Sequence, residues 1–545
     1  MAAGGTNVFL GLKPRIAPHL LDDRYASACS NVYLDNGYLK PLAGLSTVQQ
    51  TFSHSPKVIW KWDDNPYWIS STDETLTITR AINPSSNKLY FSGAEQPKVT
   101  ELGDGPGSVF TGAGPYPNGN NVYNLGVVKP LNAPLVSVPE PTPTPDRDYN
   151  ALDQETRYYI YTYVNEWGEE SAASPPSAQV TCYDDSHCTI TMFAPGGTAG
   201  YKPMQFIRIY RSNTGTSTTA FQFVAEVSIA TMTYTDTLKS AELSEVAETL
   251  LWEIPPADLK NMRSVASQFF AGTRSDSTGT HEVCFSEVLV PYAWPLAYRF
   301  PVADEPVAMA VNGADLVVLT KGRPVVFVGS SPQAMQQIQI SEYQPCMNPL
   351  SVTVFMGMVV YAGADGLIGV SSSQGFVDLT QEILTREQWA ELGPENMRIT
   401  VWERYLYIST PTSGYLFDLV NKTYWPITVT FDAAFYDGYT DTLYLVQGDS
   451  LYKFNEGEAL SYSWTSKWYQ SPAMSFASAR VNALSQNTCT FEYLIDGTVR
   501  LKRRISSPEI FRLPALRGRI MFYRLSGTAL VRSASMGTSS SELVL

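Results

Sequence analysis

Short strand patterns bounded by turns recur along the chain at intervals of 38 to 47 residues. In each unit a turn precedes an aromatic or β-branched run, and the runs begin at Phe269, Leu316, Met358, Tyr405 and Leu443. The later four are followed, after a further turn, by a second run at 325–328, 367–370, 415–419 and 451–454. A period of roughly 40–50 residues with several strands per unit is typical of β-propeller blades. A series of unrelated hairpins remains the alternative, because no unit carries a Trp-Asp signature.

Helical patterns are scarce elsewhere in the sequence. The best candidate lies within 379–392, where Thr385 and Gln388 have the spacing of a capping box. The strand runs are short, rich in aromatic and β-branched residues, and many are bounded by Gly, Asn, Asp or Pro. The sequence therefore predicts a mainly β fold with a β-propeller-like body.

A second group of strands interrupts the propeller pattern. A proline-rich segment at 138–145 is typical of an extended linker. It precedes about six short strands, a number and spacing that fit an immunoglobulin-like sandwich. In residues 165–169, Gly168 fits the backbone angles of a hairpin turn. The pattern resembles a fibronectin type III module, and we expect it to be inserted into the propeller.

The last part of the chain differs in charge. From Arg480 onward, ten basic and four acidic side chains give a net charge of +6, whereas the preceding residues carry −20. Its strand patterns predict a small basic β module. The expected domains are an N-terminal segment with the first blades (1–130), the inserted sandwich (131–250), the remaining blades (251–460) and the basic module (461–545).

The basic side chains of this module are the candidate assembly contacts. On a strand, Lys502 and Arg504 face one side and Arg503 the other, so the three need not form one patch. They can meet an acidic protein surface, including another copy of the chain, or DNA phosphates. We favour the protein contact. The six candidates are Arg500, Lys502, Arg503, Arg504, Arg517 and Arg519.

Composition excludes several classes of protein. Of the 545 residues, 17% are charged and 12% aromatic, which argues against general disorder. The net charge of −14 argues against a simple nucleic-acid binder. No run approaches the roughly 18 apolar residues of a membrane-spanning helix, and the N-terminus does not resemble a secretory signal. We therefore expect synthesis in a cytoplasm. Six cysteines are too sparse for a disulfide scaffold.

Signals for catalysis or metal binding are weak. The four histidines are scattered, and no nucleophile elbow, phosphate loop or dinucleotide fingerprint is present. Cys182, His187 and Cys188 lie close in sequence, but a fourth ligand at a recognisable spacing is missing. We therefore expect a protein that is not an enzyme, with no catalytic residue, metal or cofactor.

Propellers also host glycosidases, which use paired carboxylates. The adjacent acidic pairs at 63–64, 169–170 and 184–185 do not build such a pair, because neighbouring strand residues face opposite ways. Trp60, Trp62 and Trp68 could stack on sugars, although such residues are more often core packing. A carbohydrate-binding or depolymerising propeller used in host attachment is therefore the alternative function. A host adhesion protein with a fibronectin-like module is a third hypothesis, disfavoured by the missing secretion signal.

Several stretches, taken in order, resemble the tail nozzle or packaged-DNA stabilisation proteins (tail tubular protein B) of short-tailed bacteriophages. Each motif is short, and their order over about residues 7–540 carries the resemblance. They are FLGLKPR (9–15), ASACSNVYLDNGYLKP (26–41), LYFSGAEQPKVT (89–100), YTYVNEWGEES (161–171), FSE (285–287) with AWP (293–295), LTKGRP (319–324), ADGL (364–367) and TREQW (385–389).

The resemblance implies a structural virion protein that contains a β-propeller and forms a six-fold ring in the viral tail. Such a homo-oligomer sits below the portal and the head-to-tail adaptor, contacts tail fibres or a needle, and lines the channel of genome ejection. Double-stranded DNA would pass without sequence-specific binding. An acidic body suits such a conduit, because like charges prevent adhesion to phosphate. The basic module and the acidic body would be the two unlike faces of a ring interface.

Overall fold

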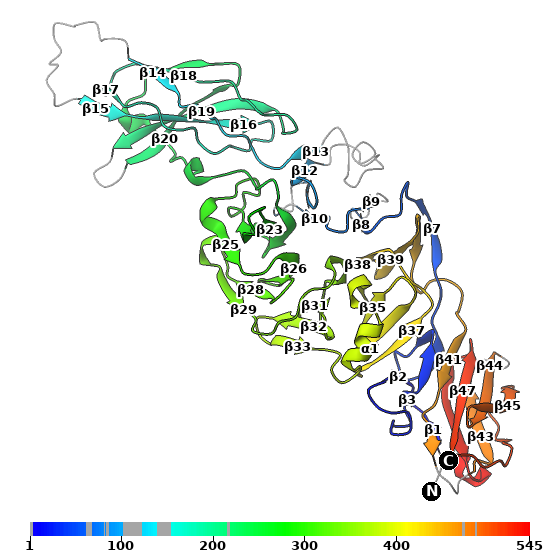
Figure 1. Ribbon diagram of the computed structural model, residues 1–545. Coiled ribbons are helices and arrows are strands. Elements are labelled where there is room, and N and C mark those ends of the chain that lie inside the picture. Colours follow the sequence, from blue (N-terminus) through cyan, green and yellow to red (C-terminus); the bar gives the residue numbers. More distant parts are fainter. Residues whose placement is uncertain are drawn as a thin grey trace, which may run out of the picture.

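The computed structural model describes residues 4–61, 68–80, 82, 87–101, 122–138, 154–214, 219–470, 475–484 and 488–544. The molecule is elongated, with the inserted strands at one end, the propeller in the middle and the C-terminal strands at the other end (Figure 1). Both chain ends lie at this last part. Nearly all regular structure in the described residues is strand, in many small sheets. The predicted mainly β class is confirmed.

Seven small sheets in the described residues form the propeller blades. The first two blades are β8 (Val58–Lys61) with β9 (Trp68–Ser71), and β10 (Thr77–Arg80), β11 (Lys88–Ser92), β12 (Lys98–Glu101) and β13 (Val122–Asn124). The next two are β22 (Lys260–Val265), β23 (Phe269–Ser275), β24 (His281–Phe285) and β25 (Arg299–Val302), then β26 (Pro306–Asn312), β27 (Asp315–Thr320), β28 (Val325–Val328) and β29 (Gln336–Gln339).

The last three blades complete the circuit. They are β30 (Thr353–Phe355), β31 (Met358–Ala362), β32 (Leu367–Ser371) and β33 (Gly375–Asp378); β34 (Arg398–Trp402), β35 (Tyr405–Ser409), β36 (Gly414–Asp418) and β37 (Thr423–Ile427); and β38 (Ala433–Asp437), β39 (Thr442–Gln447), β40 (Ser450–Lys453) and β7 (Ser46–Thr51). The N-terminal strand β7 therefore supplies the outer strand of the last blade.

The first strands of the blades stand side by side around a common axis. β10 contacts β22, and the series continues through β26, β30, β34 and β38 to β8. The step from the β8–β9 blade to the β10–β13 blade is closed by a shared core that includes Ile69, Leu76 and Phe91. The blades thus form a closed ring, and the predicted propeller-like body is present.

The sequence repeat corresponds to one hairpin of each blade, between its first and second strands. The second strands begin at Phe269, Asp315, Met358, Tyr405 and Thr442, each within one residue of the predicted run. Each of the five turns before them contains a residue with a positive φ angle, as the twist of a tight hairpin requires: Ala266, Gly313, Met356, Glu403 and Asp441. The second strands β31 and β35 are buried along their whole length, so they form the middle of each blade.

Helical structure is brief. The helix α1 (Arg386–Glu391) begins after Thr385. The Thr385 hydroxyl accepts a hydrogen bond from the Gln388 backbone N–H, and the Gln388 side-chain oxygen accepts one from the Thr385 backbone N–H. The predicted capping box is confirmed, but residues 379–385 are not helical, because the box starts the helix at its own position. Short 3₁₀ turns are η3 (Ser240–Glu242), η4 (Thr249–Leu251), η5 (Leu296–Tyr298), η6 (Pro332–Ala334), η7 (Pro349–Ser351), η8 (Pro394–Asn396) and η9 (Ser540–Leu543).

The inserted strands build a sandwich-like unit. One sheet contains β14 (Leu135–Ser137), β18 (Cys188–Thr191) and β21 (Thr233–Asp236); a second contains β16 (Tyr159–Asn165), β19 (Met204–Thr214) and β20 (Thr219–Ser228); β15 (Gln154–Arg157) pairs with β17 (Val180–Tyr183). Their core includes Tyr159, Tyr161, Ile190 and Ile207. Gly168 has a φ of 75° in the predicted hairpin turn.

That hairpin fastens the insert to the second blade. Lys88 of β11 lies 4.1 Å from the Trp167 ring centre and 2.8 Å from a Glu169 carboxylate oxygen. Lys202 and Tyr123 also contact the indole ring. These groups come from both sides of the junction, so the insert is docked by side chains as well as by its two connections.

We expect Trp167→Ala to loosen this junction, because it removes two cation–π contacts and an aromatic edge contact worth about 1–3 kcal/mol together. Small-angle scattering should then report a larger and more variable maximum dimension than for the unchanged protein. Tyr158→Ala alters an aromatic side chain of the insert outside the junction and should leave the scattering unchanged. Equal scattering curves for all three proteins would contradict this role of Trp167.

The C-terminal strands form two sheets, and each receives a strand from the start of the chain. One sheet has the order β1 (Gly4–Thr6), β48 (Val531–Gly537), β43 (Ser478–Ala483), β46 (Phe511–Arg512). The other has the order β4 (Ala28–Ser30), β41 (Tyr462–Thr465), β47 (Ile520–Gly527), β44 (Cys489–Ile495), β45 (Thr498–Arg504), and β42 (Tyr469–Gln470) also pairs with β47. We refer to this pair of sheets as the C-terminal module.

The N-terminal segment also joins the propeller. β2 (Leu10–Leu12) pairs with β37 and with β3 (Tyr25–Ala26), and β5 (Val32–Tyr33) pairs with β6 (Lys40–Pro41). The first part of the chain thus pairs with a late blade and with the C-terminal module, whereas the sequence grouped it with the first blades. The domain boundaries 130, 250 and 460 stay predictions.

Candidate functional site

The predicted assembly contacts gather around one edge strand of the C-terminal module. β45 is the last strand of its sheet and pairs only with β44 among the described strands. Every residue of β45 except Leu501 is exposed. Arg500, Lys502, Arg503 and Arg504 therefore present their charges along an open backbone edge.

The alternation of the strand divides these charges between two faces. Lys502 Nζ lies 3.0 Å from Glu492 Oε1, and Arg524 Nη1 lies 3.3 Å from the other oxygen. Glu492 of β44 is the cross-strand partner of Lys502 on β45 and of Arg524 on β47, so its carboxylate lies between these two cations and pairs with both. Arg503 instead lies 4.7 Å from the Phe511 ring centre, where it covers the edge of the module core.

The other two candidates lie in the loop between β46 and β47. Arg517 and Arg519 are exposed there. The Asp496 carboxylate accepts from the N–H groups of Arg519 and Ile520, at 3.0 and 2.9 Å, and this fastens the loop to the β44–β45 turn. The structure therefore places Arg517 and Arg519 at the turn end of β45, and Lys502 to Arg504 farther along it.

Two physical roles fit a basic edge strand. Charged side chains keep an open edge from pairing with strands of other molecules. The same charges attract an acidic surface and orient its approach. Lys502 and Arg524 share the one carboxylate of Glu492, so these three side chains carry a net positive charge, and both roles are compatible with this geometry.

A second candidate site lies on the propeller axis and was missed by sequence reasoning. A cavity of about 280 Å³ is lined by residues of six first strands or the turns beside them, among them Val58, Thr77, Arg263, Ala308 and Ala434. A neighbouring hollow of about 120 Å³ shares Val58, Leu350 and Ala434 with it and adds residues 398–400 of β34. Every blade thus contributes to this axial region.

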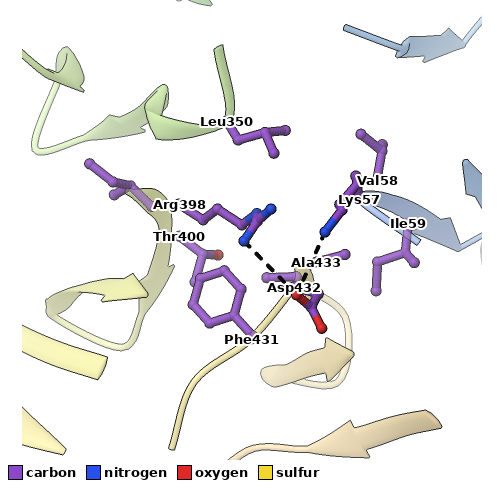
Figure 2. Close-up of a pocket in the computed structure, with 11 residues that line it drawn as sticks. Lys57, Val58, Ile59, Leu350, Arg398, Thr400, Phe431, Asp432 and Ala433 are labelled. Atoms are coloured by element: carbon purple, nitrogen blue, oxygen red, sulfur yellow. Dashed lines mark ion pairs between the residues drawn. The ribbon is translucent and has the colours of Figure 1, made fainter. Parts of the chain in front are cut away.

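Charged side chains cluster at the smaller hollow (Figure 2). Lys57 Nζ and Arg398 Nη1 approach the same oxygen of Asp432, at 3.8 and 3.9 Å. Arg398 Nη2 lies 3.5 Å from Glu74 Oε1, and its buried Nε atom has no hydrogen-bond partner among the described residues. These distances are long for charge-assisted hydrogen bonds, which are about 2.7–2.9 Å. The donors of Arg398 are therefore only weakly engaged.

Arg263 enters the larger cavity from a β-bulge. The register between β22 and β23 shifts between Lys260 and Arg263, and Asn261 in the bulge has a φ of 56°. The Arg263 guanidinium makes one long hydrogen bond, 3.4 Å to the Met262 carbonyl, and no carboxylate of the described residues pairs with it. Partial burial lowers the pKa of Arg263 to about 10, so the half-buried side chain is a cation at neutral pH.

No sequence motif could have found this cluster, because its members lie between positions 57 and 432 on separate blades. The one available signal was a charged residue, such as Arg263 or Arg398, in the first strand of a blade. Inner strands of a propeller are crowded, so a long cation there needs a partner or a cavity.

The cysteines and tryptophans considered in the sequence analysis contact other side chains of the protein wherever the structure describes them. Cys182 and Cys188 are buried, and Arg157 Nη1 lies 3.7 Å from the Cys188 sulfur, where a cation already faces the thiol. Trp68 packs edge-on against Phe435 and Tyr444. Trp60 lies beside Arg80, at 5.3 Å. Trp62 and the acidic pair 63–64 lie outside the described residues.

The remaining acidic pairs are engaged structurally. Glu169 pairs with Lys88, and Glu170 pairs with Arg208 while it accepts from Thr162 and Tyr210. Asp184 accepts from the Ser240 N–H. In the described part of the chain, no group of three or more His, Cys, Asp and Glu side chains has a metal-binding arrangement. No helix within these ranges has the length and apolar character to span a membrane.

Comparison with known proteins adds only weak similarities. No protein-family model matches the chain, and no curated protein matches it. Among the solved structures that match, each of the following shares 10% identity with this chain: apo AztD from Citrobacter koseri (77% of this chain, 100% of that chain, TM-score 0.25), PorZ from Porphyromonas gingivalis (90% and 82%, 0.22), and Trypanosoma rangeli sialidase with the inhibitor DANA (92% and 98%, 0.22). Similarities of this size carry no argument about function.

Proposed function

We propose that the chain is a structural subunit of a bacteriophage tail, in which copies form the nozzle or tube ring that surrounds the DNA exit channel. The observation that carries the proposal is the open basic edge β45 on a chain whose residues before Arg480 have a net charge of −20. A closed ring needs two different faces that attract one another. A basic edge and an acidic body on one subunit supply such a pair.

The positions of the resembling motifs support the same proposal. Residues 9–15 and 26–41 run between a late blade and the C-terminal module. Residues 161–171 form the hairpin that docks the insert on the blade containing residues 89–100. These four motifs therefore lie at junctions that set the shape of the molecule, which is the property that a ring subunit must keep constant.

The proposed partners follow from this role. Six copies would form the ring, the head-to-tail adaptor would lie above it, and fibres or a needle would attach to it. The acidic body would face passing double-stranded DNA without binding it, since both carry negative charge. The protein would be made in the host cytoplasm and would end in the virion tail, without catalysis.

Charge reversal at the edge tests the ring contact. We expect the double variant Arg500→Glu and Arg517→Glu to raise the dissociation constant of the ring at least ten-fold, because attraction to the acidic neighbour becomes repulsion. Both side chains are exposed and make no hydrogen bond or ion pair with the described residues. The measurement is mass by light scattering across a dilution series, with electron microscopy of the particles.

A matched control changes the same net charge elsewhere. Lys239→Glu and Lys260→Glu alter exposed residues of the insert and of the propeller, and this protein should assemble as the unchanged one does. Rings of undiminished stability in the edge variant would count against the edge as the contact. A purified protein that stays monomeric and is absent from virions would overturn the proposed function itself.

The second candidate function is a carbohydrate-binding or depolymerising propeller used in host attachment. The axial cavity favours it, because a concave site in which several polar side chains converge is a usual form of a small-molecule site. Glycan-array binding or release of sugars from a bacterial polysaccharide would support this function. Absence of both, with ring formation intact, would leave the structural role alone.

A further inference from the structure

We propose that the axial cavity of the propeller is a binding site for a small organic carboxylate, which the guanidinium of Arg263 holds. This inference does not depend on ring assembly. It rests on the position of Arg263, on the charges around it and on the mixture of polar and apolar side chains in the rest of the wall.

The bulge in β22 determines the position of Arg263. Two residues, Asn261 and Met262, oppose the single residue Gly272 of β23, because Lys260 pairs with Thr273 and Arg263 with Ala271. A bulge of this kind redirects the following side chain. The Met262 N–H is held by Ser92 Oγ at 2.8 Å, and the Asn261 amide donates to Thr273 at 2.9 Å. The left-handed backbone of Asn261 is therefore kept in place by partners on two blades.

The charge count leaves one cation without an acidic partner. Lys57 and Arg398 share Asp432, and Arg398 also approaches Glu74. Arg263 has no carboxylate partner among the described residues, and its hydrogen bond to Met262 is long. A cation that is partly removed from water, as the half-buried Arg263 is, gains from an acidic partner. One bound monovalent anion would provide that pairing.

The wall indicates a carboxylate carried by an organic molecule. A guanidinium presents two parallel N–H donors that match the two oxygens of a carboxylate. The wall around it combines apolar residues such as Ala308 and Val352 with the polar side chains of Thr75, Thr77 and Asn261, which can meet the hydroxyl groups of an organic acid. A doubly charged phosphate would meet one cation without an acidic partner, and it would also face the Glu74 carboxylate in the same wall. The volume of about 280 Å³ is near the lower end of the range for small-molecule sites, about 300 Å³.

Calorimetric titration of the full-length protein provides the test, with sodium glucuronate as the probe and glucose as its neutral match. We expect saturable binding of glucuronate and at least ten-fold weaker binding of glucose. Arg263→Gln should weaken glucuronate binding at least ten-fold. Arg323→Gln, an exposed arginine of the β26–β29 blade, should leave it unchanged.

A second variant and a second anion complete the test. Arg263→Lys keeps the charge without the planar fork, so it should fold as the unchanged protein does and bind glucuronate more weakly. Inorganic phosphate separates the two anion chemistries, and tighter binding of phosphate would overturn the carboxylate assignment. Equal affinity of the protein for glucuronate and glucose, or unchanged glucuronate binding in both Arg263 variants, would overturn the site.

Discussion

Asp236→Ala should destabilise the inserted sandwich by about 3–5 kcal/mol, because it leaves the buried Arg211 charge without an acidic partner. Arg211 Nη1 lies 2.8 Å from Asp236 Oδ2, and both side chains are fully buried. Tyr159 donates to the same oxygen at 2.8 Å. Burial, together with the Asp236 charge, raises the pKa of Tyr159, so it stays a donor at neutral pH. The Asp236 carboxylate therefore neutralises the Arg211 charge and accepts a hydrogen bond from the Tyr159 hydroxyl.

Hydrogen exchange of the β16 and β19 amides under increasing urea measures this effect inside the insert. Glu226→Ala is the matched control, since its partner Arg208 is partly exposed and keeps a second carboxylate at Glu170. An exposed ion pair contributes about 0–1 kcal/mol, so the control should exchange almost as the unchanged protein does. Similar losses in the two variants would show that burial of the Arg211–Asp236 pair has no special energetic weight.

Phe9→Ala should destabilise the C-terminal module by about 3–5 kcal/mol, the usual range for emptying a buried phenylalanine site. The Phe9 ring is fully buried and packs edge-on against Trp464, with ring centres 4.9 Å apart. The next residue, Leu10, accepts a hydrogen bond from the Trp464 indole at 3.0 Å. The N-terminal segment thus completes a core whose other buried members lie at Trp402 and later in the chain.

Exchange of the β41 and β47 amides reports the stability of this core. Val8→Ala provides the control, because Val8 is 38% exposed and its truncation opens no enclosed cavity. We expect a loss of less than about 1 kcal/mol there. If Phe9→Ala left the exchange of β41 and β47 unchanged, the N-terminal segment would not be part of the cooperative core of the module.

Sequence reasoning was accurate where the signal is local. Turn residues and aromatic runs predicted the second strands of five blades, and the blade hairpins occupy those positions. Thr385 and Gln388 predicted the start of α1, because a capping box involves residues three positions apart. Strand alternation separated Arg503 from Lys502, and the structure pairs Lys502 with Glu492 and sets Arg503 against Phe511.

The pairings that bring distant parts of the chain together had no such signal. β7 completes a blade whose other strands lie after residue 430, and β1 and β4 join sheets near the end of the chain. A short strand such as β1 can pair with any open edge of suitable direction. The choice depends on which core its side chains enter, as Phe9 enters that of Trp464.

The axial cavity shows the same limit at the level of a site. Lys57, Arg263, Arg398 and Asp432 are unremarkable when each is considered in its own segment. They become neighbours because the first strands of separate blades surround one axis. Electrostatic pairing depends on distance in space, so the unpaired charge of Arg263 is a property of the assembled ring of blades.

The sequence by itself determined the mainly β class, the repeated hairpins, the inserted strands and the division into an acidic body and a basic C-terminal part. These properties depend on composition and on residues within a few positions of one another. The tertiary structure alone decided the closure of the seven blades, the threading of the N-terminus through the C-terminal module, the exposure of β45 as an edge, and the cavity that Arg263 enters. Each of these depends on contacts between residues far apart in the chain, which form only when burial of a common core outweighs the entropy of bringing them together.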